Sequence, residues 1–361
     1  MLKIFIKSYM AEDNEFPPTL LVSIVSEQPL PNLVFILAAK REGMRYIFLS
    51  TEKMEKRGMT ESLLAAADIH PDEAMTFEIS PEDPKAIRSK LMNVPIEKGA
   101  KILLNATGGT KIMSQTVIDH IRQEYPDSRI VYAPLQGSRV TELYPSPGLA
   151  ESMPLPRIDL FTYIRSHGFE FSCQEEPVGT FQECEKIMQK VISSHGISKV
   201  EELKDVHTKY SSADDKRYYS GAWFEEWVYY TIRSTLKLSE DEIMLNLHLR
   251  NVLSAKEEHN NEIDIAFTYN NKLYAVECKA HKSYDPKKLN AAAAKMSMLS
   301  RILGLNCRPI MIFCTHVQEE NLAHITDMTT IFGMKAFLSL DDLRSREQFR
   351  KRLNELLEIQ N

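Results

Sequence analysis

Three charged residues, Asp264, Glu277 and Lys279, stand in two neighbouring stretches that favour β-strands. In residues 262–268 isoleucine and phenylalanine alternate with smaller or polar residues, and the second stretch is rich in leucine, tyrosine and valine. An Asn-Asn pair at 270–271 separates the two stretches. Because asparagine tolerates the left-handed conformation of a two-residue hairpin turn, the spacing predicts a β-hairpin that carries all three charges.

The turn sets the register of this hairpin. If residues 270–271 form the loop, Asp264 lies opposite Glu277, and residues opposite each other share one face of the sheet. Glu277 and Lys279 point to the same side because side chains alternate along a strand. Two facing carboxylates repel each other unless a positive group lies between them, and a divalent cation that prefers hard oxygen ligands supplies such a group. The sequence therefore predicts a metal site, with the Cys278 backbone carbonyl within reach of the same ion.

A second interpretation of the hairpin needs no metal. In the same register Glu262 lies opposite Lys279, and these two side chains form an ion pair on a solvated sheet face while Asp264 faces water. The surroundings of the hairpin decide between the two interpretations.

The composition is typical of a globular protein of two or three domains. Of the 361 residues, 43% are hydrophobic and 26% are charged. The formal net charge is −6. A site for nucleic acid must therefore be a local basic patch, such as the lysine-rich residues 279–288.

The five cysteines are odd in number, scattered and without a Cys-x-x-Cys pair, which argues against a disulfide framework and a zinc site. They indicate a reducing environment, and we expect a cytoplasmic protein. No apolar run approaches membrane-spanning length, so we expect no membrane segment.

Residues 1–150 alternate strand and helix patterns, which is typical of a parallel sheet with helices on both faces. The expected strands cover residues 20–25, 46–50, 76–79, 101–105 and 129–133, and a further strand candidate covers 3–10. In such sheets ligands bind beyond the carboxyl ends of the strands. Two of these ends are distinctive, because Ser-Glu-Gln-Pro-Leu-Pro-Asn follows the first strand at 26–32 and Asn-Ala-Thr-Gly-Gly-Thr-Lys ends the fourth at 105–111.

The loop at 105–111 has the composition of an anion-binding loop. Paired glycines let backbone N–H groups approach a phosphate, Thr110 caps the following helix and Lys111 adds positive charge. An ordinary turn between a strand and a helix is the alternative, because the loop matches neither a Walker A motif nor a dinucleotide-binding motif.

Together, the two loop motifs resemble the CARF domain, the Rossmann-like α/β sensor of type III CRISPR systems, over roughly residues 1–150. The resemblance implies a parallel sheet and a homodimer that binds a cyclic oligoadenylate across its two-fold axis. This activator is most often cyclic tetra-adenylate and otherwise cyclic hexa-adenylate. The resemblance places the ligand on Ser26, Gln28, Thr107, Gly108, Gly109, Thr110 and Lys111, with Thr51 as a further candidate.

The remaining residues divide into a linker and a second domain. Prolines and a serine cluster mark residues 151–212 as a linker region. Residues 213–361 hold the hairpin with helical stretches on either side, which predicts a second α/β domain.

The helical stretch after residue 221 carries two adjacent carboxylates. Glu225 shares a helical row with Ile232, which predicts that Glu225 points inward. For Glu226 we expect a solvated position beside Arg233 or Lys237.

A helix Glu, a strand Asp and a Glu-x-Lys on the paired strand resemble the PD-(D/E)xK nuclease superfamily, whose domains have a restriction-endonuclease-like α/β fold. Glu225, Asp264, Glu277 and Lys279 match the catalytic positions in that order. The resemblance implies that Asp264, Glu277 and the Cys278 carbonyl hold Mg²⁺ or Mn²⁺, with Glu225 as a further candidate ligand. It also implies that Lys279 orients the attacking water or stabilises the phosphoryl oxygens.

Joined, the two resemblances imply an endonuclease of type III CRISPR antiviral defence that a cyclic oligoadenylate activates allosterically. Its implied substrates are single-stranded RNA, single-stranded DNA or both. Nicking of supercoiled double-stranded DNA is one alternative. A sensor domain that degrades its own ligand, and a nucleotide-responsive regulator that binds nucleic acid, are the others.

Overall fold

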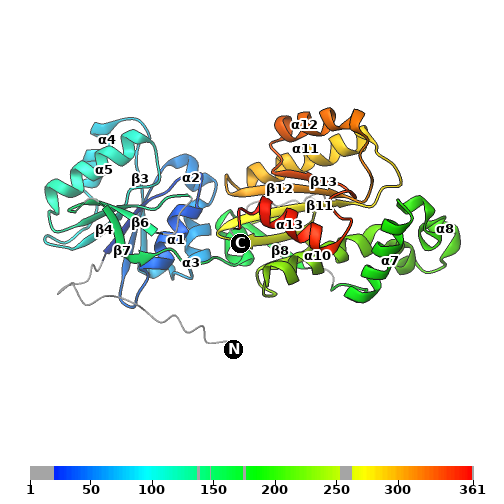
Figure 1. Cartoon of the computed structure of the whole chain (residues 1–361). Coiled ribbons are helices and arrows are strands. Elements are labelled where there is room, and N and C mark those ends of the chain that lie inside the picture. The colour runs from blue at the N-terminus through cyan, green and yellow to red at the C-terminus, as the bar shows by residue number, and fades with distance from the viewer. Residues whose placement is uncertain (1–19, 136–138, 147, 174–175, 253–261, 360–361) are drawn as a thin grey trace. The chain divides into compact units, whose positions relative to one another are not determined.

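The computed structural model describes residues 20–135, 139–146, 148–173, 176–252 and 262–359. The strand expected at residues 3–10 lies outside these ranges. The chain divides into two units, shown in Figure 1. The first comprises the described residues up to Ile158 together with Arg165–Gly168, and the second comprises Asp159–Ile164 and the described residues from Phe169 onward.

The first unit is built on a seven-stranded sheet in the order β3-β2-β1-β4-β5-β6-β7. Its first five strands are parallel, as the alternating strand and helix patterns predict. They are β1 (Leu20–Ile24), β2 (Arg45–Ser50), β3 (Ala74–Glu78), β4 (Ile102–Asn105) and β5 (Arg129–Tyr132). Two antiparallel strands, β6 (Arg139–Tyr144) and β7 (Gly148–Pro154), extend the sheet beyond β5.

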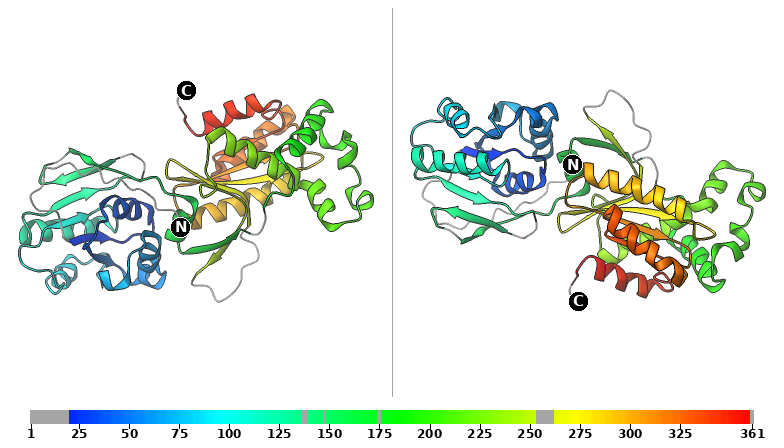
Figure 2. Two further views of the ribbon diagram at one scale, coloured as in Figure 1. Left: turned by 90° about the horizontal axis from the view of Figure 1, so that it is seen from below. Right: turned by 90° about the horizontal axis from the view of Figure 1, so that it is seen from above.

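Helices cover both faces of this sheet, as Figures 1 and 2 show. On one face lie α1 (Leu30–Ala39), α2 (Glu52–Lys56) and α3 (Met59–Ala67), and on the other lie α4 (Pro84–Leu91) and α5 (Lys111–Glu124). The chain leaves β1 toward β2 and later returns on the other side of β1 as β4. The strand order therefore reverses between β1 and β4, where ligands bind in sheets of this kind.

Apolar side chains hold β1 and β4 in the middle of this unit. Both strands are buried along their whole length, as expected for parallel strands with helices on both faces. Val22 and Leu104 pack with Val117 and Ile121 of α5 in one apolar cluster. This packing thus holds the carboxyl ends of β1 and β4 in place, and these ends carry the candidate ligand loops.

The second unit is built on a six-stranded sheet in the order β13-β12-β11-β10-β9-β8. The predicted hairpin forms two central strands, β10 (Glu262–Tyr269) and β11 (Lys272–Lys279). The other strands are β8 (Phe169–Cys173), β9 (Ile243–Asn251), β12 (Cys307–Phe313) and β13 (Ala336–Leu338). Pairing is antiparallel from β8 to β11 and parallel from β11 to β13.

Part of the stretch that the sequence indicates as a linker belongs to this second unit. β8 forms its edge strand, and α7 (Phe181–Ser193) packs against α10 (Trp223–Leu236). Cys184, Met188 and Val191 of α7 are buried in the main apolar cluster of the unit. The segment before the hairpin therefore contributes both a strand and a packed helix to this domain.

Helices also cover both faces of the second sheet, with α10 and α13 (Arg346–Leu356) on one face and α11 (Pro286–Ile302) and α12 (Glu319–Phe332) on the other (Figure 2). The remaining helical segments are η1 (Pro71–Glu73), α6 (Leu160–Ser166), η2 (Ile197–Lys199), η3 (Glu201–Leu203), α8 (Val206–Lys209), α9 (Ala213–Arg217) and η4 (Tyr218–Ala222). Among the described residues, no helix is both long and apolar enough to cross a membrane.

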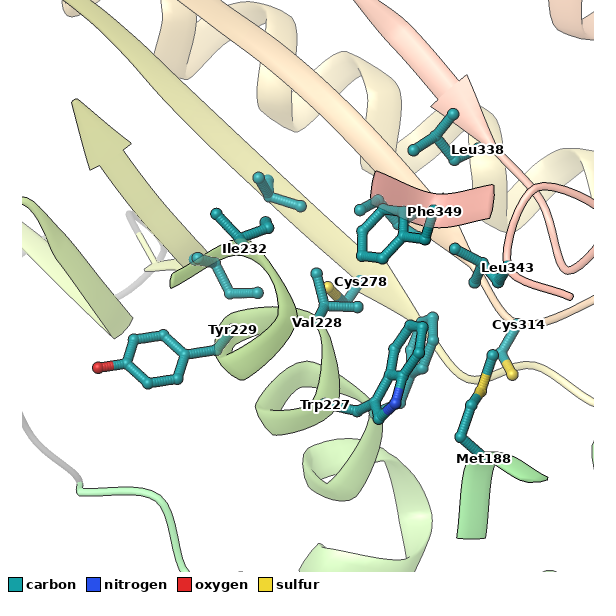
Figure 3. Close-up of a cluster of buried hydrophobic side chains, with 14 of the residues drawn as sticks. Met188, Trp227, Val228, Tyr229, Ile232, Cys278, Cys314, Leu338, Leu343 and Phe349 are labelled. Atoms are coloured by element: carbon teal, nitrogen blue, oxygen red, sulfur yellow. The ribbon is translucent and has the colours of Figure 1, made fainter. Parts of the chain in front are cut away.

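The packing of α10 separates the two faces of β11. Trp227 of α10 and Phe349 of α13 lie with Cys278 of β11 in the apolar cluster of Figure 3, and the rings of Trp227 and Phe349 stack with centroids 5.5 Å apart. Because side chains alternate along a strand, Glu277 and Lys279 point to the opposite face, which α11 covers.

Candidate functional site

The hairpin has the turn and the register that its sequence predicts. Both turn asparagines, Asn270 and Asn271, adopt left-handed conformations, with φ of 51° and 56°. The two strands pair in the expected register from Tyr269 back to Ile265. This pairing brings Asp264 beside the end of β11.

Asp264 lies where the regular pairing of β10 stops. Its Oδ2 accepts a hydrogen bond from the backbone N–H of Cys278 at 2.7 Å, in the place of a main-chain carbonyl. On the other side the pairing with β9 skips this position, and Asn246 of β9 has a left-handed φ of 50°. Oε1 of Glu262 lies 3.9 Å from Nε2 of His248 on β9. Glu262 is thus close to His248 and not paired with Lys279, the partner that the interpretation without a metal predicts. The Asp264 side chain is thus buried and held by a backbone donor.

Two lysines neutralise the buried carboxylate of Glu277, which is 3% exposed. The Nζ of Lys279 lies 2.6 Å from Oε1 of Glu277 and 3.7 Å from Oδ2 of Asp264. From α11, the Nζ of Lys295 lies 3.2 Å from Oε2 of Glu277. A buried carboxylate needs such partners, because leaving it unpaired costs several kcal/mol, of the order of 3–5.

The electrostatics of the site favour additional positive charge. Burial, with repulsion from Glu277, raises the pKa of Asp264 to about 6, although Lys279 and the Cys278 N–H oppose this shift. Burial alone lowers the pKa of Lys279, but the attraction of Asp264 and Glu277 outweighs it and raises that pKa above its ordinary value. Lys279 is therefore charged at neutral pH, and Asp264 releases its proton more readily when a cation approaches.

Glu225 comes from the first turn of α10 and is partly buried. Burial, followed by repulsion from Asp264, raises the pKa of Glu225 to about 8, and attraction by Lys279 opposes the shift. Glu225 thus lies within electrostatic reach of the hairpin carboxylates, on the inward side that its helical row predicts.

The oxygen atoms around Asp264 suit a hard divalent cation. The Cys278 N–H points toward β10, and since the N–H and C=O of a strand residue point the same way, the Cys278 carbonyl faces that side too. Mg²⁺ is commonly held by one or two carboxylates, with water and substrate phosphate completing its shell. Within the described ranges no group of three or more His, Cys, Asp or Glu side chains could hold a metal ion. The residues therefore fit a sparse, partly water-filled site better than a cage of protein ligands.

The expectation that Glu226 is solvated is wrong. Its side chain is 2% exposed, and its carboxylate accepts hydrogen bonds from the N–H groups of Val178 at 2.8 Å and Gly179 at 2.9 Å. Burial raises the pKa of Glu226 although these donors oppose the shift. The carboxylate ties the start of α10, next to Glu225, to the loop before α7.

Lys295 is a site residue that the sequence interpretation did not identify. It lies three residues after Ala292 and four before Leu299, which are both buried, and these spacings place all three on one face of α11. A lysine within the buried row of an alanine-rich helix is the signal that could have revealed it.

The two candidate ligand loops of the first unit meet at the carboxyl ends of β1 and β4, which pair side by side. A Cβ atom on Gly108 would lie 1.8 Å from the carbonyl oxygen of Ile24 at the end of β1. Gly109 has a φ of 76°. Only glycine permits this close approach and this conformation without strain. Thr51 follows β2, the other neighbour of β1, and caps α2.

Two threonine side chains of the second loop are held by the protein itself. The hydroxyl of Thr107 donates to Oδ1 of Asn105 at 2.5 Å and accepts from the N–H of Ala133 at 2.7 Å. The hydroxyl of Thr110 donates to the carbonyl of Pro81 at 2.6 Å and caps α5. These hydroxyls shape the loop, while Lys111 is exposed at the first position of α5.

The first loop is tied to the loop that follows β2. Ser26 donates from its hydroxyl to the carbonyl of Gln28 at 3.0 Å, which stabilises a turn. Glu27, between them, forms an ion pair with Lys53 of α2, the helix that Thr51 caps. Seven of the eight predicted ligand residues therefore belong to three loops at the carboxyl ends of β2, β1 and β4, which are neighbours in the sheet, and Lys111 follows the third loop as the first residue of α5.

The fold is similar to several solved structures at low sequence identity. Protein VC1899 from Vibrio cholerae has a TM-score of 0.71 and 16% identity, over 94% of this chain and 98% of that one. Can2 from Sulfobacillus thermosulfidooxidans, in complex with cyclic tetra-adenylate, has a TM-score of 0.64 and 19% identity, over 94% and 99%. A type III CRISPR defence DNA nuclease activated by cyclic oligoadenylate has a TM-score of 0.57 and 20% identity, over 85% of this chain and 48% of its own.

Two protein-family models match the chain, one for each unit. The Card1 CARF domain matches residues 20–163, and the Card1-like endonuclease domain matches residues 212–335. A comparison with curated proteins finds no match. The chain therefore combines a Card1 CARF domain with a Card1-like endonuclease domain that follows it.

Proposed function

We propose that this protein is a metal-dependent endonuclease of type III CRISPR antiviral defence that cyclic tetra-adenylate activates through its CARF domain. Its proposed substrates are single-stranded RNA and single-stranded DNA. The observation that carries the proposal is the pairing of Glu277 with Lys279 and Lys295 beside Asp264, on the hairpin of a domain that matches a nuclease family. Two neighbours of similar fold support the activator, because one is solved with cyclic tetra-adenylate and the other is named as activated by cyclic oligoadenylate.

In this proposal Asp264, Glu277 and the Cys278 carbonyl hold Mg²⁺ or Mn²⁺, and Glu225 contributes from the edge of the site. A bound ion of this kind polarises a phosphate and lowers the pKa of a bound water. The Lys279 ammonium, 2.6 Å from Glu277, is placed to orient the attacking water and to stabilise charge on the phosphoryl oxygens. Its raised pKa keeps it charged for this role.

Lys295 has a second role in this proposal. Its Nζ lies 3.2 Å from Oε2 of Glu277. With a cation on that carboxylate, the Lys295 ammonium would be available to contact a substrate phosphate. The positive charge that the chain lacks overall is thereby supplied locally, where the substrate binds.

Activation requires that the ligand bind the active arrangement of the protein more tightly than the inactive one. A shift from a mostly inactive to a mostly active population takes about 5.5 kcal/mol of differential affinity. A cyclic ligand held by two CARF domains of a homodimer contacts three loops in each copy. It therefore has enough phosphate and base contacts to supply such a difference.

One assay tests this function. Single-stranded RNA, single-stranded DNA and supercoiled duplex DNA are each incubated with the protein, with Mn²⁺, Mg²⁺ or EDTA, and with cyclic tetra-adenylate, cyclic hexa-adenylate or no ligand. We expect cleavage of a single-stranded substrate only when a metal and cyclic tetra-adenylate are both present. Nicking of the duplex alone supports the alternative substrate, and cleavage in EDTA contradicts the proposed chemistry.

The same reactions separate the remaining alternatives. Chromatography of the activator after incubation shows whether the CARF domain degrades it. A protein that binds oligonucleotides and the activator but cleaves none of the substrates is a regulator and not a nuclease.

A further inference from the structure

Asn246 of β9 carries a buried side-chain amide for which the described residues supply no hydrogen-bond partner. The side chain is 5% exposed. The backbone of Asn246 is also unusual for a strand, because its φ of 50° is left-handed. An amide buried without a partner and a backbone held in a rarely populated conformation both reduce stability. Together they indicate a position that serves a function.

Asn246 lies beside the candidate active site. It is the residue opposite Asp264 in the pairing of β9 with β10, because the residue pairs on both sides of this position keep one register. The left-handed backbone interrupts the alternation of side chains along β9, so that the successive residues Leu245 and Asn246 line one pocket. The amide of Asn246 therefore faces a pocket that adjoins the strand next to the one that carries Asp264.

The pocket that Asn246 faces, the Asn246 pocket, is also lined by Glu225 and Glu226 of α10. Its volume is about 30 Å³, and roughly 10–15 Å³ is enough to hold one water-sized ligand. Two backbone N–H groups hold the Glu226 carboxylate, whereas no described residue donates a hydrogen bond to the Glu225 carboxylate. Asn246 and Glu225 thus face one small space without hydrogen-bond partners of their own.

The charge of the Asn246 pocket favours a cation. Among the described residues that line it, four carboxylates stand against one guanidinium, and these are Glu176, Asp214, Glu225, Glu226 and Arg217. A water molecule would satisfy the hydrogen bonds of the pocket but would leave this excess of negative charge. A divalent cation satisfies both needs, because carboxylate and amide oxygens are hard ligands of the kind that Mg²⁺ and Mn²⁺ take.

We propose that Asn246 and Glu225 bind a divalent cation in this pocket, in addition to the ion that Asp264 and Glu277 hold. The inference rests on the proposed function and assigns Asn246 as a further metal ligand of the nuclease domain. The two ions are neighbours, because Asn246 lies opposite Asp264. Burial, and then repulsion from Asp264, raises the pKa of Glu225, so Glu225 lies near the first ion as well. Two ions that contact one phosphate stabilise its attacking and leaving oxygens.

Mn²⁺ binding tests this site without any dependence on cleavage. Full-length protein is titrated with Mn²⁺ in the absence of activator and substrate, and electron paramagnetic resonance measures the free ion. We expect two bound ions per chain in the unaltered protein. Asn246→Gly removes the amide but permits the left-handed backbone, and its second ion should bind at least about tenfold more weakly.

The matched control is Asn270→Gly, which makes the same change at the exposed, left-handed turn of the hairpin. This variant should bind both ions as the unaltered protein does. Equal Mn²⁺ affinities in Asn246→Gly and Asn270→Gly would overturn the proposal. A single bound ion per chain in the unaltered protein would overturn it too.

Asn246→Asp tests the same site by strengthening it. Aspartate has nearly the same shape and also tolerates a left-handed backbone, but it adds a charged oxygen. One of the two Mn²⁺ ions should bind about tenfold more tightly, because ligand charge raises the affinity of a site for a cation. Asn354→Asp, which adds the same charge on α13, should leave both affinities unchanged. Unchanged affinities in Asn246→Asp would overturn the proposal.

Glu277→Gln distinguishes this site from the proposed catalytic site. It should weaken the ion that Asp264 and Glu277 hold and leave the ion of the Asn246 pocket in place, whereas loss of both ions would overturn a separate site. If Glu277→Gln changes nothing while Asn246→Gly weakens one ion, the proposed catalytic metal site fails and the Asn246 site stands. If no protein cleaves nucleic acid but Asn246→Gly still weakens one ion, the nuclease function fails and the Asn246 site again stands.

Discussion

In the candidate active site, ammonium groups from two different elements contact both oxygens of the Glu277 carboxylate. Lys279 belongs to the same strand, and Lys295 reaches across from α11. Asp264 has a different kind of partner, the backbone N–H of Cys278. We propose that Glu277 exchanges its partners when a cation binds, whereas the main chain holds Asp264.

Replacing Lys295 by Met tests this exchange. The metal-free protein should lose about 1–2 kcal/mol of unfolding free energy, because a buried carboxylate loses one of two charged partners. Thermal unfolding in EDTA measures this, and the stabilisation by Mn²⁺ should be larger than in the unaltered protein. Lys287→Met, at an exposed position of the same helix, is the control. Indistinguishable melting of the two variants would refute the role of Lys295.

The raised pKa values of Asp264 and Glu225 predict how the stability of the metal-free protein depends on pH. Both carboxyls bind a proton more tightly in the folded chain than in the unfolded chain. Their contribution to stability is complete below about pH 4 and is lost as the pH rises through about 6 for Asp264 and about 8 for Glu225.

Asp264→Asn isolates the first of these losses, because the amide can still accept from the Cys278 N–H but does not ionise. In EDTA the variant should gain stability relative to the unaltered protein between pH 5 and 8, by about 2 kcal/mol at most. Melting temperatures of the variant and the unaltered protein at matched pH values measure this difference in stability. A difference that stays constant over this range would show that Asp264 does not titrate as described.

At the scale of elements, the loop after β4 depends on glycine. Gly108→Ala places a Cβ atom 1.8 Å from the Ile24 carbonyl, so the loops after β1 and β4 must move apart. We expect the concentration of activator that gives half-maximal cleavage to rise more than tenfold, while binding of an oligonucleotide is unchanged. Gln115→Ala, at an exposed position of α5, is the matched control. An unaltered activator response in Gly108→Ala would exclude these loops as the sensor site.

Elements with a regular pattern could be predicted from the sequence, and long-range contacts could not. The Asn270-Asn271 turn sets the hairpin register by local chemistry, and the register is as predicted. β9 also carries a readable alternation of leucine with polar residues. In α12, by contrast, Met328 is the buried residue within a mostly exposed helix, so its apolar pattern is weak.

The two carboxylates of α10 show that local sequence patterns also fail to predict long-range contacts within the candidate site. A helical pattern predicts Glu225 as the more inward of the two, and Glu225 is half-buried within electrostatic reach of Asp264, whereas Glu226 is the more buried carboxylate. Glu226 is held by N–H groups of Val178 and Gly179, nearly fifty positions away, and a helical pattern carries no information about such donors. Lys295 likewise meets Glu277 only because α11 packs on the sheet.

At the scale of the whole molecule, the candidate ligand loops and the hairpin with the candidate active site belong to different units. We therefore expect that the response to the activator and the metal-dependent cleavage can be altered separately. Lys111→Glu reverses a charge that is exposed at the start of α5. It should raise the activator concentration needed for cleavage without changing the dependence on Mn²⁺ concentration. A shift of the Mn²⁺ dependence with an unchanged activator response would contradict this separation.

The central claim, that the Lys279 hairpin performs cleavage under control of the CARF domain, is tested most directly with Lys279→Ala. Cyclic tetra-adenylate binding is measured by calorimetry, and cleavage of single-stranded RNA and DNA is measured with Mn²⁺ and saturating activator. We predict that activator affinity is unchanged while kcat falls at least a hundredfold, because Lys279→Ala removes a group that stabilises transition-state charge. Cleavage within a few-fold of the unaltered protein would contradict it.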